Sequence, residues 1–181
     1  MNNQDDTVDL IQQALTGEER ACQSILNLYK GRIFSYVYRL VHNYHDAEDI
    51  TFDTFIKCFR SLAMFDQSKP FTTWLFTIAH NLTVDYFRKH KTPPEYLVEM
   101  HPGGDDPVTE YERKRRAEIV DDALARLAPV DRELVILFHK EEHSYQEIAG
   151  IMNLPVTTIK TRLHRARKKL HDIVCRKRNK P

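Results

Sequence analysis

The last part of the chain carries a dense run of basic side chains beside threonines. Six of the ten residues from Lys160 to Lys169 are Lys or Arg. Guanidinium and ammonium groups bind phosphate oxygens, and Arg, Lys and Thr also reach base edges in the major groove of DNA. A basic run of this kind also fits a solvated helix face. The flanking sequence is therefore needed to distinguish a nucleic-acid-binding surface from a basic helix face that is only exposed to solvent.

Two predicted helices and a tight turn contain this run. Ser144 and Glu147 have the types and spacing of a capping box, which opens a helix. Asn153 tolerates the left-handed conformation and Pro155 cannot continue a helix, so a second helix is expected from about Val156. The pattern predicts a helix-turn-helix, although a plain helical hairpin stays possible. The outward face of the second helix holds Thr157, Thr158, Lys160, Thr161, Arg162, His164 and Arg165.

A second group of side chains, in the first half of the chain, mixes aromatic rings with polar groups. The rings are Phe65, Phe71, Trp74, Phe76, Tyr86 and Phe87, and their polar neighbours are Thr72, Thr73, Asn81, Arg88 and Lys89. Unpaired nucleotides stack on rings and are read along their exposed edges, so this composition suits a single-stranded nucleic acid. Any one of these rings can equally be ordinary core.

Two histidines one helical turn apart, His139 and His143, are the candidates for metal binding. The zinc-protease pattern needs Glu directly after the first His, and Lys140 occupies that position. The five glycines are scattered, so no Gly-rich phosphate loop is present, and no nucleophile motif occurs. We therefore expect no enzyme: no catalytic residue, no metal, no cofactor and no small-molecule substrate.

Composition points to a helical protein of the cytoplasm. The 181 residues are 41% hydrophobic and 29% charged, which excludes wholesale disorder. The longest run without Asp, Glu, Lys or Arg is Pro70–Val84, shorter than the roughly 18 apolar residues of a membrane helix. No secretory signal is visible, and three separated cysteines fit a reducing compartment. Positive charge is concentrated in residues 153–181, where a polyanion is the expected partner.

Helical spacing of apolar residues predicts an all-α protein, with four helices in its first half. Thr7 is expected to cap the first helix and Asp46 the third, and Pro70 to open the fourth. In the third helix Phe52 and Phe55 are expected to share an apolar face. The separate charged face of that helix holds Asp46, Asp49, Asp53 and Lys57.

The elements group into two small helical domains. The first is expected over 7–91 and the second over 110–172, followed by a basic tail over 173–181. Residues 92–109 contain four of the eight prolines and two of the five glycines, which predicts a flexible linker.

Several of these segments together resemble a known family. The segments are Asp46–Phe59 and Phe71–Asn81, then Asp85 and Arg88, and later Ser144–Ala149 and Pro155–Arg167. The first group is similar to regions 2.2 to 2.4, and the second to region 4.2, of the extracytoplasmic-function sigma factors of the sigma-70 family. The resemblance extends over residues 20–172 in the same order. Thr157 is a local departure, since that family often has Gly there.

The resemblance implies a protein that binds core RNA polymerase and directs initiation at promoters through their −10 and −35 elements. Docking on the clamp helices of the β′ subunit would use Asp46, Asp49, Asp53 and Lys57, and the β subunit would also be contacted. The acidic linker would thread toward the RNA exit path. An anti-sigma factor is a further implied partner.

The resemblance also assigns DNA contacts. Phe65–Phe71, Thr72, Ile78 and Asn81 would receive a base flipped out of the non-template strand at the −10 element, with Arg88 and Lys89 nearby. The −35 element would be contacted by Thr157, Lys160, Thr161, Arg162, His164 and Arg165, and its phosphates by Arg167, Lys168 and Lys169. A stand-alone helix-turn-helix repressor with an N-terminal sensing or dimerisation domain would explain residues 128–171 equally well. It would not explain Phe71–Asn81 or the acidic helix before it.

Overall fold

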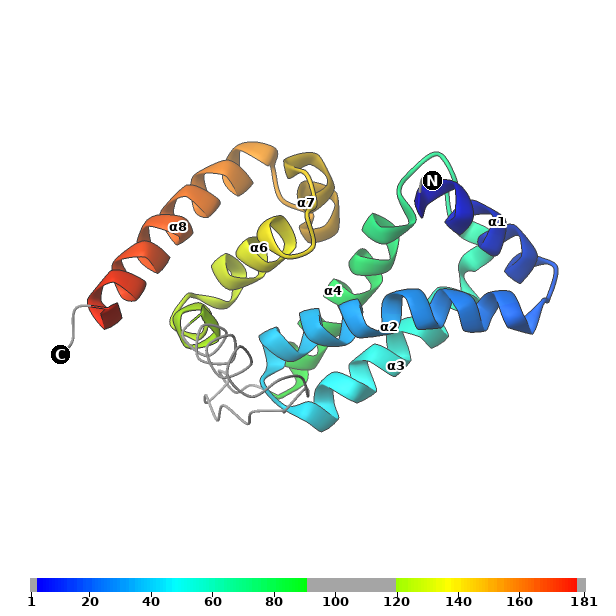
Figure 1. Ribbon diagram of the computed structural model, residues 1–181, viewed down its shortest axis with the longest axis horizontal. Helices are drawn as coiled ribbons and strands as arrows, with labels where there is room; N and C mark the ends of the chain where they lie inside the picture. Colours follow the sequence, from blue (N-terminus) through cyan, green and yellow to red (C-terminus); the bar gives the residue numbers. More distant parts are fainter. Residues whose placement is uncertain (1–2, 91–119, 179–181) are drawn as a thin grey trace, which may run out of the picture.

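The computed structural model describes residues 3–90 and 120–178. The helices are α1 (Asn3–Leu15), α2 (Glu19–Val41), α3 (Tyr44–Arg60), the short 3₁₀ helix η1 (Leu62–Met64), α4 (Phe71–His90), α6 (Pro129–His139), α7 (Tyr145–Met152) and α8 (Val156–Arg178) (Figure 1). Residues 120–125 are also helical. Within the described ranges there is no strand, and the all-α prediction is confirmed. The predicted linker over 92–109 lies outside the described residues.

The described helices form two units. Helices α1 to α4 make the N-terminal unit, and α6 to α8 make the C-terminal unit (Figure 1). Ile25, Ile33 and Val37 recur at helical spacing on α2 and are fully buried. They belong to a core that continues through Leu75 and Phe76 of α4. None of the described helices is both long and apolar enough to cross a membrane.

Two of the predicted helix starts are wrong, and both helices begin earlier. Thr7 lies inside α1, where it is 5% exposed and shares a 3.1 Å hydrogen bond with the hydroxyl of Tyr29. The cap of α3 is Asn43, whose Oδ1 accepts a 3.1 Å hydrogen bond from the amide of Asp46. Asp46 is therefore in the first turn of α3, where its charge still favours the positive end of the helix dipole.

Helix α6 begins, and the chain turns before α8, where the sequence predicts. Pro129 opens α6. The side chain of Ser144 accepts from the amide of Glu147, and the Glu147 carboxylate accepts from the amide of Ser144, which completes the capping box. Asn153 ends α7 in the left-handed conformation, with φ 50° and ψ 47°. These local signals end α7 at Met152, and α8 begins after the turn, at Val156.

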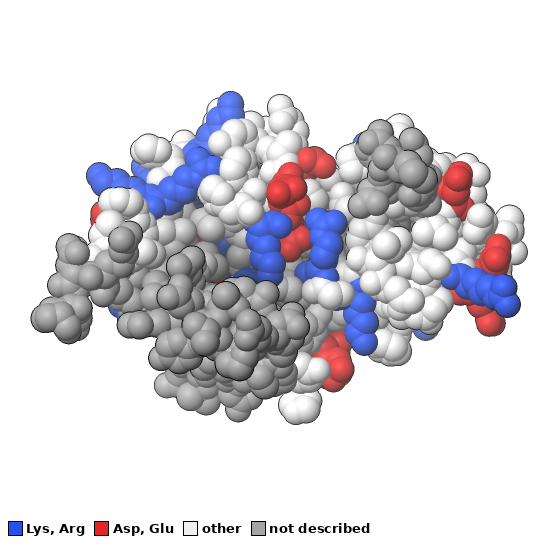
Figure 2. All heavy atoms as spheres, in the orientation of Figure 1, with Lys and Arg blue, Asp and Glu red and all other residues white. Residues whose placement is uncertain are grey.

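The two units pack against each other. Helix α7 lies on α4, and α6 lies on α2. Figure 2 shows basic and acidic side chains next to each other where the two units meet. The contacts across this boundary join residues about a hundred positions apart, such as Arg32 and Glu141.

Candidate polymerase-docking and DNA-binding surfaces

The outward face of α3 combines carboxylates with an exposed ring. The buried side of this helix is filled by residues such as Ile50, Phe55 and Cys58. Asp49, Asp53 and Lys57 are exposed on the opposite side, as expected. Phe52 does not share the apolar face of Phe55: it is 67% exposed and lies among these charges.

An exposed ring among carboxylates offers a partner both apolar area and charge. Rings are enriched at the centres of protein interfaces, because they bury a large area for a small loss of side-chain freedom. Sequence reasoning placed Phe52 in the core, since Phe is usually buried and the apolar spacing of α3 included it. The signal that could have found it is its position in the sequence, directly before Asp53 and one helical turn after Asp49.

Asp46 differs from the other acidic residues predicted for docking. Its side chain is half-buried, and its Oδ2 accepts a 2.7 Å hydrogen bond from the hydroxyl of Tyr86 on α4. Burial, the hydrogen bond to Asp46 and the charge of Asp46 raise the pKa of Tyr86 to about 12. Asp46 therefore joins α3 to α4 and belongs only partly to the exposed face of α3.

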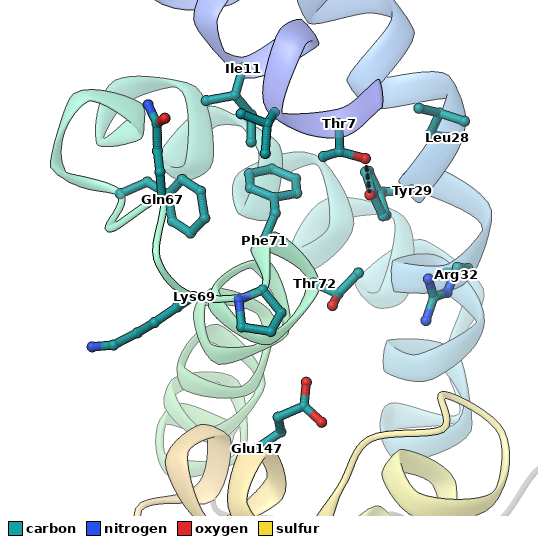
Figure 3. Close-up of a pocket in the computed structure, with 13 residues that line it drawn as sticks. Thr7, Ile11, Leu28, Tyr29, Arg32, Gln67, Lys69, Phe71, Thr72 and Glu147 are labelled. Carbon is teal, nitrogen blue, oxygen red and sulfur yellow. Dashed lines mark hydrogen bonds between the residues drawn. The ribbon is translucent and has the colours of Figure 1, made fainter. Parts of the chain in front are cut away.

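A cavity of about 560 Å³ lies between α1, α2, the loop before α4 and the start of α7 (Figure 3). It is lined by Thr7, Val8, Ile11, Leu28, Tyr29, Arg32, Phe65, Gln67, Lys69, Pro70, Phe71, Thr72 and Glu147. The rings of Phe65, Phe71 and Trp74 pack on one another with centroid distances of 5.1 to 5.8 Å. The cavity thus has aromatic, hydroxyl and cationic walls.

The structure brings together only part of the residues predicted for the −10 element. Phe65, Phe71 and Thr72 line the cavity. Ile78 is only 7% exposed and belongs to the core. Asn81 is exposed farther along α4. Neither Ile78 nor Asn81 is among the described residues that line the cavity.

The remaining two predicted contacts are at the far end of α4. Arg88 is exposed and forms a 3.1 Å ion pair with Asp85, one turn earlier on the same helix. Lys89 is also exposed. Both cations lie in the last turn of α4, where they favour the negative end of the helix dipole. They could contact a backbone phosphate but are separate from the cavity.

The loop before α4 is held by its own side chains. Oδ1 of Asp66 accepts from the amide of Ser68 at 3.1 Å and from the hydroxyl of Ser68 at 2.7 Å. These hydrogen bonds, together with the charge of Lys69, lower the pKa of Asp66. An aspartate that bonds two residues ahead is a common way to order a turn. The turn fixes the loop between Phe65 and Phe71, whose rings line the cavity.

Helix α8 exposes the second predicted surface. Lys and Arg side chains follow this helix along one edge of the molecule in Figure 2. The exposed residues are Thr157, Lys160, Thr161, His164, Arg165, Arg167, Lys168 and Lys169. A shallow groove of about 300 Å³ at the start of the helix is lined by Thr157, Thr158, Thr161, Arg162 and Arg165. A groove with hydroxyl and guanidinium groups suits the edges of bases.

Two of the predicted −35 contacts also have partners within the C-terminal unit. Nη1 of Arg162 lies 2.9 Å from Oδ1 of Asp131 on α6. Arg167 stacks over the ring of Phe138 at 4.7 Å and donates to Nε2 of His139 at 3.0 Å. These contacts tie α8 to α6.

The two histidines considered for metal binding have different surroundings. His139 accepts the hydrogen bond from Arg167, and its pKa is lowered by burial and by that guanidinium. His143 is 4% exposed and packs edge-on against Phe76 of α4, with a centroid distance of 5.0 Å. In the described part of the chain, His, Cys, Asp and Glu side chains form no group of three that could hold a metal ion.

Comparison with known proteins gives the family. The family model of Sigma-70 region 2 matches residues 25–92, and that of Sigma-70, region 4 matches residues 117–170. The chain is 33% identical to the ECF RNA polymerase sigma factor SigW of Bacillus subtilis over 174 residues, covering 88% of this chain and 92% of that protein. The chain therefore belongs to the sigma-70 family of RNA polymerase sigma factors, and within it to the extracytoplasmic-function (ECF) group.

Solved structures agree with this assignment. The structure of CnrH in complex with the cytosolic domain of CnrY matches with a TM-score of 0.68 at 25% identity, over 91% of this chain and 94% of that one. The sigma factor RpoE of Bartonella quintana, solved with the anti-sigma factor NepR, matches with a TM-score of 0.69 at 25% identity, over 84% of this chain and 95% of that one.

Proposed function

We propose that this sigma factor binds core RNA polymerase through the exposed face of α3 and reads promoter DNA through α4 and α8. The observation that carries the proposal is that two exposed surfaces lie on the two parts of the chain that match the sigma-70 family models. An acidic face with an exposed ring lies on region 2, and a basic face with a groove lies on region 4. The domain limits proposed are 7–91, 110–172 and a basic tail over 173–181, joined by 92–109.

The docking contact on polymerase is proposed to be the β′ clamp helices, with the β subunit as a second contact. Phe52 would enter an apolar pocket there, and Asp49 and Asp53 would pair with basic side chains around it. Charged groups at the rim of an interface speed the encounter and fix its orientation, whereas a buried ring contributes more of the affinity. Asp46 would contribute less than its neighbours because Tyr86 already occupies one of its oxygens.

At the −10 element, the cavity beside Phe65, Phe71 and Thr72 is proposed to receive an unpaired base of the non-template strand. Flipping a base costs a few kcal/mol of unstacking, and a pre-formed aromatic cavity offsets part of that cost. Asn81 is proposed to contact the same strand farther along α4. Arg88 and Lys89 are proposed to contact backbone phosphates.

At the −35 element, the start of α8 is proposed to enter the major groove. Thr157, Lys160, Thr161, His164 and Arg165 would face base edges. Lys168 and Lys169 would contact phosphates, which adds affinity without sequence preference. Arg162 and Arg167 are proposed to reach DNA only while keeping or exchanging their partners Asp131 and His139.

The remaining parts of the proposal concern partners and place of action. We infer an anti-sigma factor as a regulator, because the similar structure of RpoE is a complex with the anti-sigma factor NepR, and that of CnrH is a complex with the cytosolic domain of CnrY. The proposed function needs no catalytic group, cofactor or small-molecule substrate in this chain. Its place of action is the cytoplasm, where polymerase and promoter DNA are found.

Reconstituted transcription tests the proposal. The purified chain is added to core RNA polymerase from the organism that encodes it, with fragmented genomic DNA as template, and the transcripts are sequenced. The proposal predicts transcripts whose start sites share spaced −10 and −35 sequences and which disappear when the chain is omitted. A protein that binds duplex DNA tightly alone but never changes the output of core polymerase would instead be a repressor.

A further inference from the structure

Two aromatic rings of the C-terminal unit stack on each other beside α8. The ring of Phe138, near the end of α6, lies nearly parallel to the ring of Tyr145, the first residue of α7, with a centroid distance of 5.0 Å and an interplanar angle of 18°. Both rings are half-buried. The capping box orders the chain at Tyr145, because it joins the preceding Ser144 to Glu147. We call Phe138 and Tyr145 the aromatic shelf.

Two cations of α8 lie over the aromatic shelf, one on each ring. Nζ of Lys160 is 5.7 Å from the centre of the Tyr145 ring, and Cζ of Arg167 is 4.7 Å from the centre of the Phe138 ring. Both distances are within the range of about 6 Å for a cation–π contact. Residues seven positions apart lie on nearly the same side of a helix, about 10.5 Å apart along its axis. One pair of stacked rings can therefore hold both cations.

Arg167 has a second contact, which uses only one of its donors. Its Nε donates a 3.0 Å hydrogen bond to Nε2 of His139, and the stacking on Phe138 involves the flat face of the guanidinium. A guanidinium has five N–H donors in its plane. Neither contact uses the four N–H donors of the two terminal nitrogens, which are the donors that bind a phosphate in bidentate fashion.

A cation that is held in place before it binds loses less freedom on binding. Lys and Arg have long, flexible stems, and ordering these stems on contact with a ligand costs conformational entropy. Lys160 and Arg167 are both exposed, although each lies on a ring. The rings therefore restrict the directions of the two charges and leave them accessible to DNA.

We propose that the aromatic shelf positions two DNA contacts of α8: Tyr145 directs Lys160 toward one base pair of the −35 element, and Phe138 holds Arg167 against a phosphate. Neither ring itself touches DNA, so Phe138 and Tyr145 are positioning residues. The inference rests on the proposed function, in which the start of α8 enters the major groove at the −35 element. It adds that side chains of α6 and α7 influence which promoters are read.

Removal of the Tyr145 ring tests the first half of the proposal. The assay is binding of holoenzyme, made from core polymerase and the full chain, to promoters that differ by one base pair in the −35 element. Lys160→Met should lower discrimination at one base pair at least about fivefold. Tyr145→Leu should lower discrimination at the same base pair by roughly two- to fivefold, as expected for loss of an exposed cation–π contact. Tyr145→Phe keeps a ring and should discriminate as the wild type does.

A purely structural role of Tyr145 would give a different pattern. If the ring only stabilised the helix-turn-helix, its loss would weaken readout at every base pair and would add to the effect of Lys160→Met. Positioning predicts that Tyr145→Leu has no further effect in a chain that already carries Lys160→Met. Additive effects would reject the role of Tyr145. Phe34→Leu, which replaces a ring stacked on Tyr38 of α2, is the matched control and should leave −35 discrimination unchanged.

Removal of the Phe138 ring tests the second half. Phe138→Leu should weaken binding to every −35 sequence alike, by roughly two- to fivefold, because a phosphate contact has no base preference. Phe138→Leu and Arg167→Met should both reduce the dependence of affinity on salt, and the double variant should bind no more weakly than Arg167→Met. The same salt dependence in Phe138→Leu as in the wild type would reject the role of Phe138.

Nuclear magnetic resonance of the wild-type chain tests the two contacts even if a ring variant does not fold. A proton above an aromatic ring is shifted upfield by the ring current. The side-chain methylene protons next to the charged groups of Lys160 and Arg167 should therefore be shifted upfield from their values in an unstructured peptide. Unshifted protons at both residues would overturn the proposal. Circular dichroism establishes which of the variants are folded.

These outcomes separate the inference from the proposed function. If the holoenzyme starts transcription at fixed sites but Tyr145→Leu and Phe138→Leu bind every promoter as the wild type does, the inference fails and the proposed function stands. If the folded chain never directs core polymerase to a promoter, the proposed function fails and the inference fails with it, even where the upfield shifts place both cations on the rings.

Discussion

Arg132 and His42 meet across the two units, with Nη1 of the guanidinium 2.8 Å from Nε2 of the imidazole. Burial, the charge of Arg132 and the charge of Arg39 lower the pKa of His42 to about 4. His143, which packs against Phe76 across the same boundary between the units, also has a pKa lowered mainly by burial. Arg32 lowers it further, and Glu147 opposes the shift. Both histidines are therefore neutral near pH 7 while the two units are packed together.

This arrangement predicts that acid weakens the folded chain. In the unfolded chain, His42 titrates near its ordinary pKa of about 6.5. Below that pH the unfolded chain binds a proton that the folded chain binds only near pH 4. The contribution of His42 to stability is thus complete above about pH 6.5 and is lost progressively as the pH falls toward 4.

The measurement is the free energy of unfolding between pH 7.5 and 5. His42→Asn is the comparison variant, because Asn tolerates the left-handed conformation of this position, with φ 55°, and does not titrate. We expect a shallower loss of stability with acid in His42→Asn than in the wild type. Identical slopes would show that His42 does not contribute to the loss of stability in acid.

Removal of the exposed ring on α3 is predicted to weaken polymerase binding without weakening the fold. Phe52→Ala should raise the Kd for core polymerase roughly thirtyfold, about 2 kcal/mol, because an exposed ring at an interface centre contributes much of the affinity. The free energy of unfolding should change by less than about 0.5 kcal/mol. Leu15→Ala removes another exposed apolar side chain, 43% exposed at the end of α1, and should leave the Kd unchanged. Equal effects of both variants would reject the docking face.

Replacement of Arg165 is predicted to change which promoters are read. Arg165 lines the groove at the start of α8 and is exposed, so Arg165→Ala should reduce discrimination at one or two −35 positions by about 1–3 kcal/mol. Holoenzyme binding to a panel of single-base −35 variants measures this effect.

A phosphate contact should behave differently in the same panel. Lys169 lies farther along α8 and is exposed. Lys169→Ala should weaken binding to all sequences alike and reduce the dependence of affinity on salt. If Arg165→Ala and Lys169→Ala both lower affinity uniformly, the division between base and phosphate contacts is wrong.

The capping box of α7 is predicted to stabilise the C-terminal unit. Ser144→Ala removes the side-chain acceptor of the Glu147 amide and should cost about 1 kcal/mol of stability. Ser24→Ala is the control, because the Ser24 hydroxyl bonds only to the carbonyl of Arg20 within an exposed stretch of α2. Chemical denaturation measures both, and equal values for the two variants would contradict the role of the cap.

Local signals in the sequence predict much of the C-terminal unit. The bond between Ser144 and Glu147, the left-handed Asn153 and the opening of α6 at Pro129 depend on neighbours in the chain. The start of α3 was harder, because Asn43 and Asp46 are both good caps. The ring of Tyr44 packs on Phe34 of α2, with a centroid distance of 5.2 Å. This tertiary contact involves the first residue of α3, which begins earlier than predicted.

The contacts between the two units could not be predicted from the sequence. Asp131, Arg132 and Glu133 are adjacent charged residues, which ordinarily indicates a solvated face. Arg132 and Glu133 are instead buried, because their partners come from α2 and α4. A residue pattern within one helix carries no information on a partner about ninety positions away. For the same reason the helix spacing could not show that Phe52 stays exposed while Phe55 is buried.

The most direct test of the whole account is transcription by core RNA polymerase with and without the purified chain on the same promoter DNA. The account predicts that core polymerase alone starts at random or not at all, and that the chain restores initiation at fixed sites. Phe52→Ala should lower this activity and Leu15→Ala should not. A folded chain that neither binds core polymerase nor changes its start sites would contradict the account.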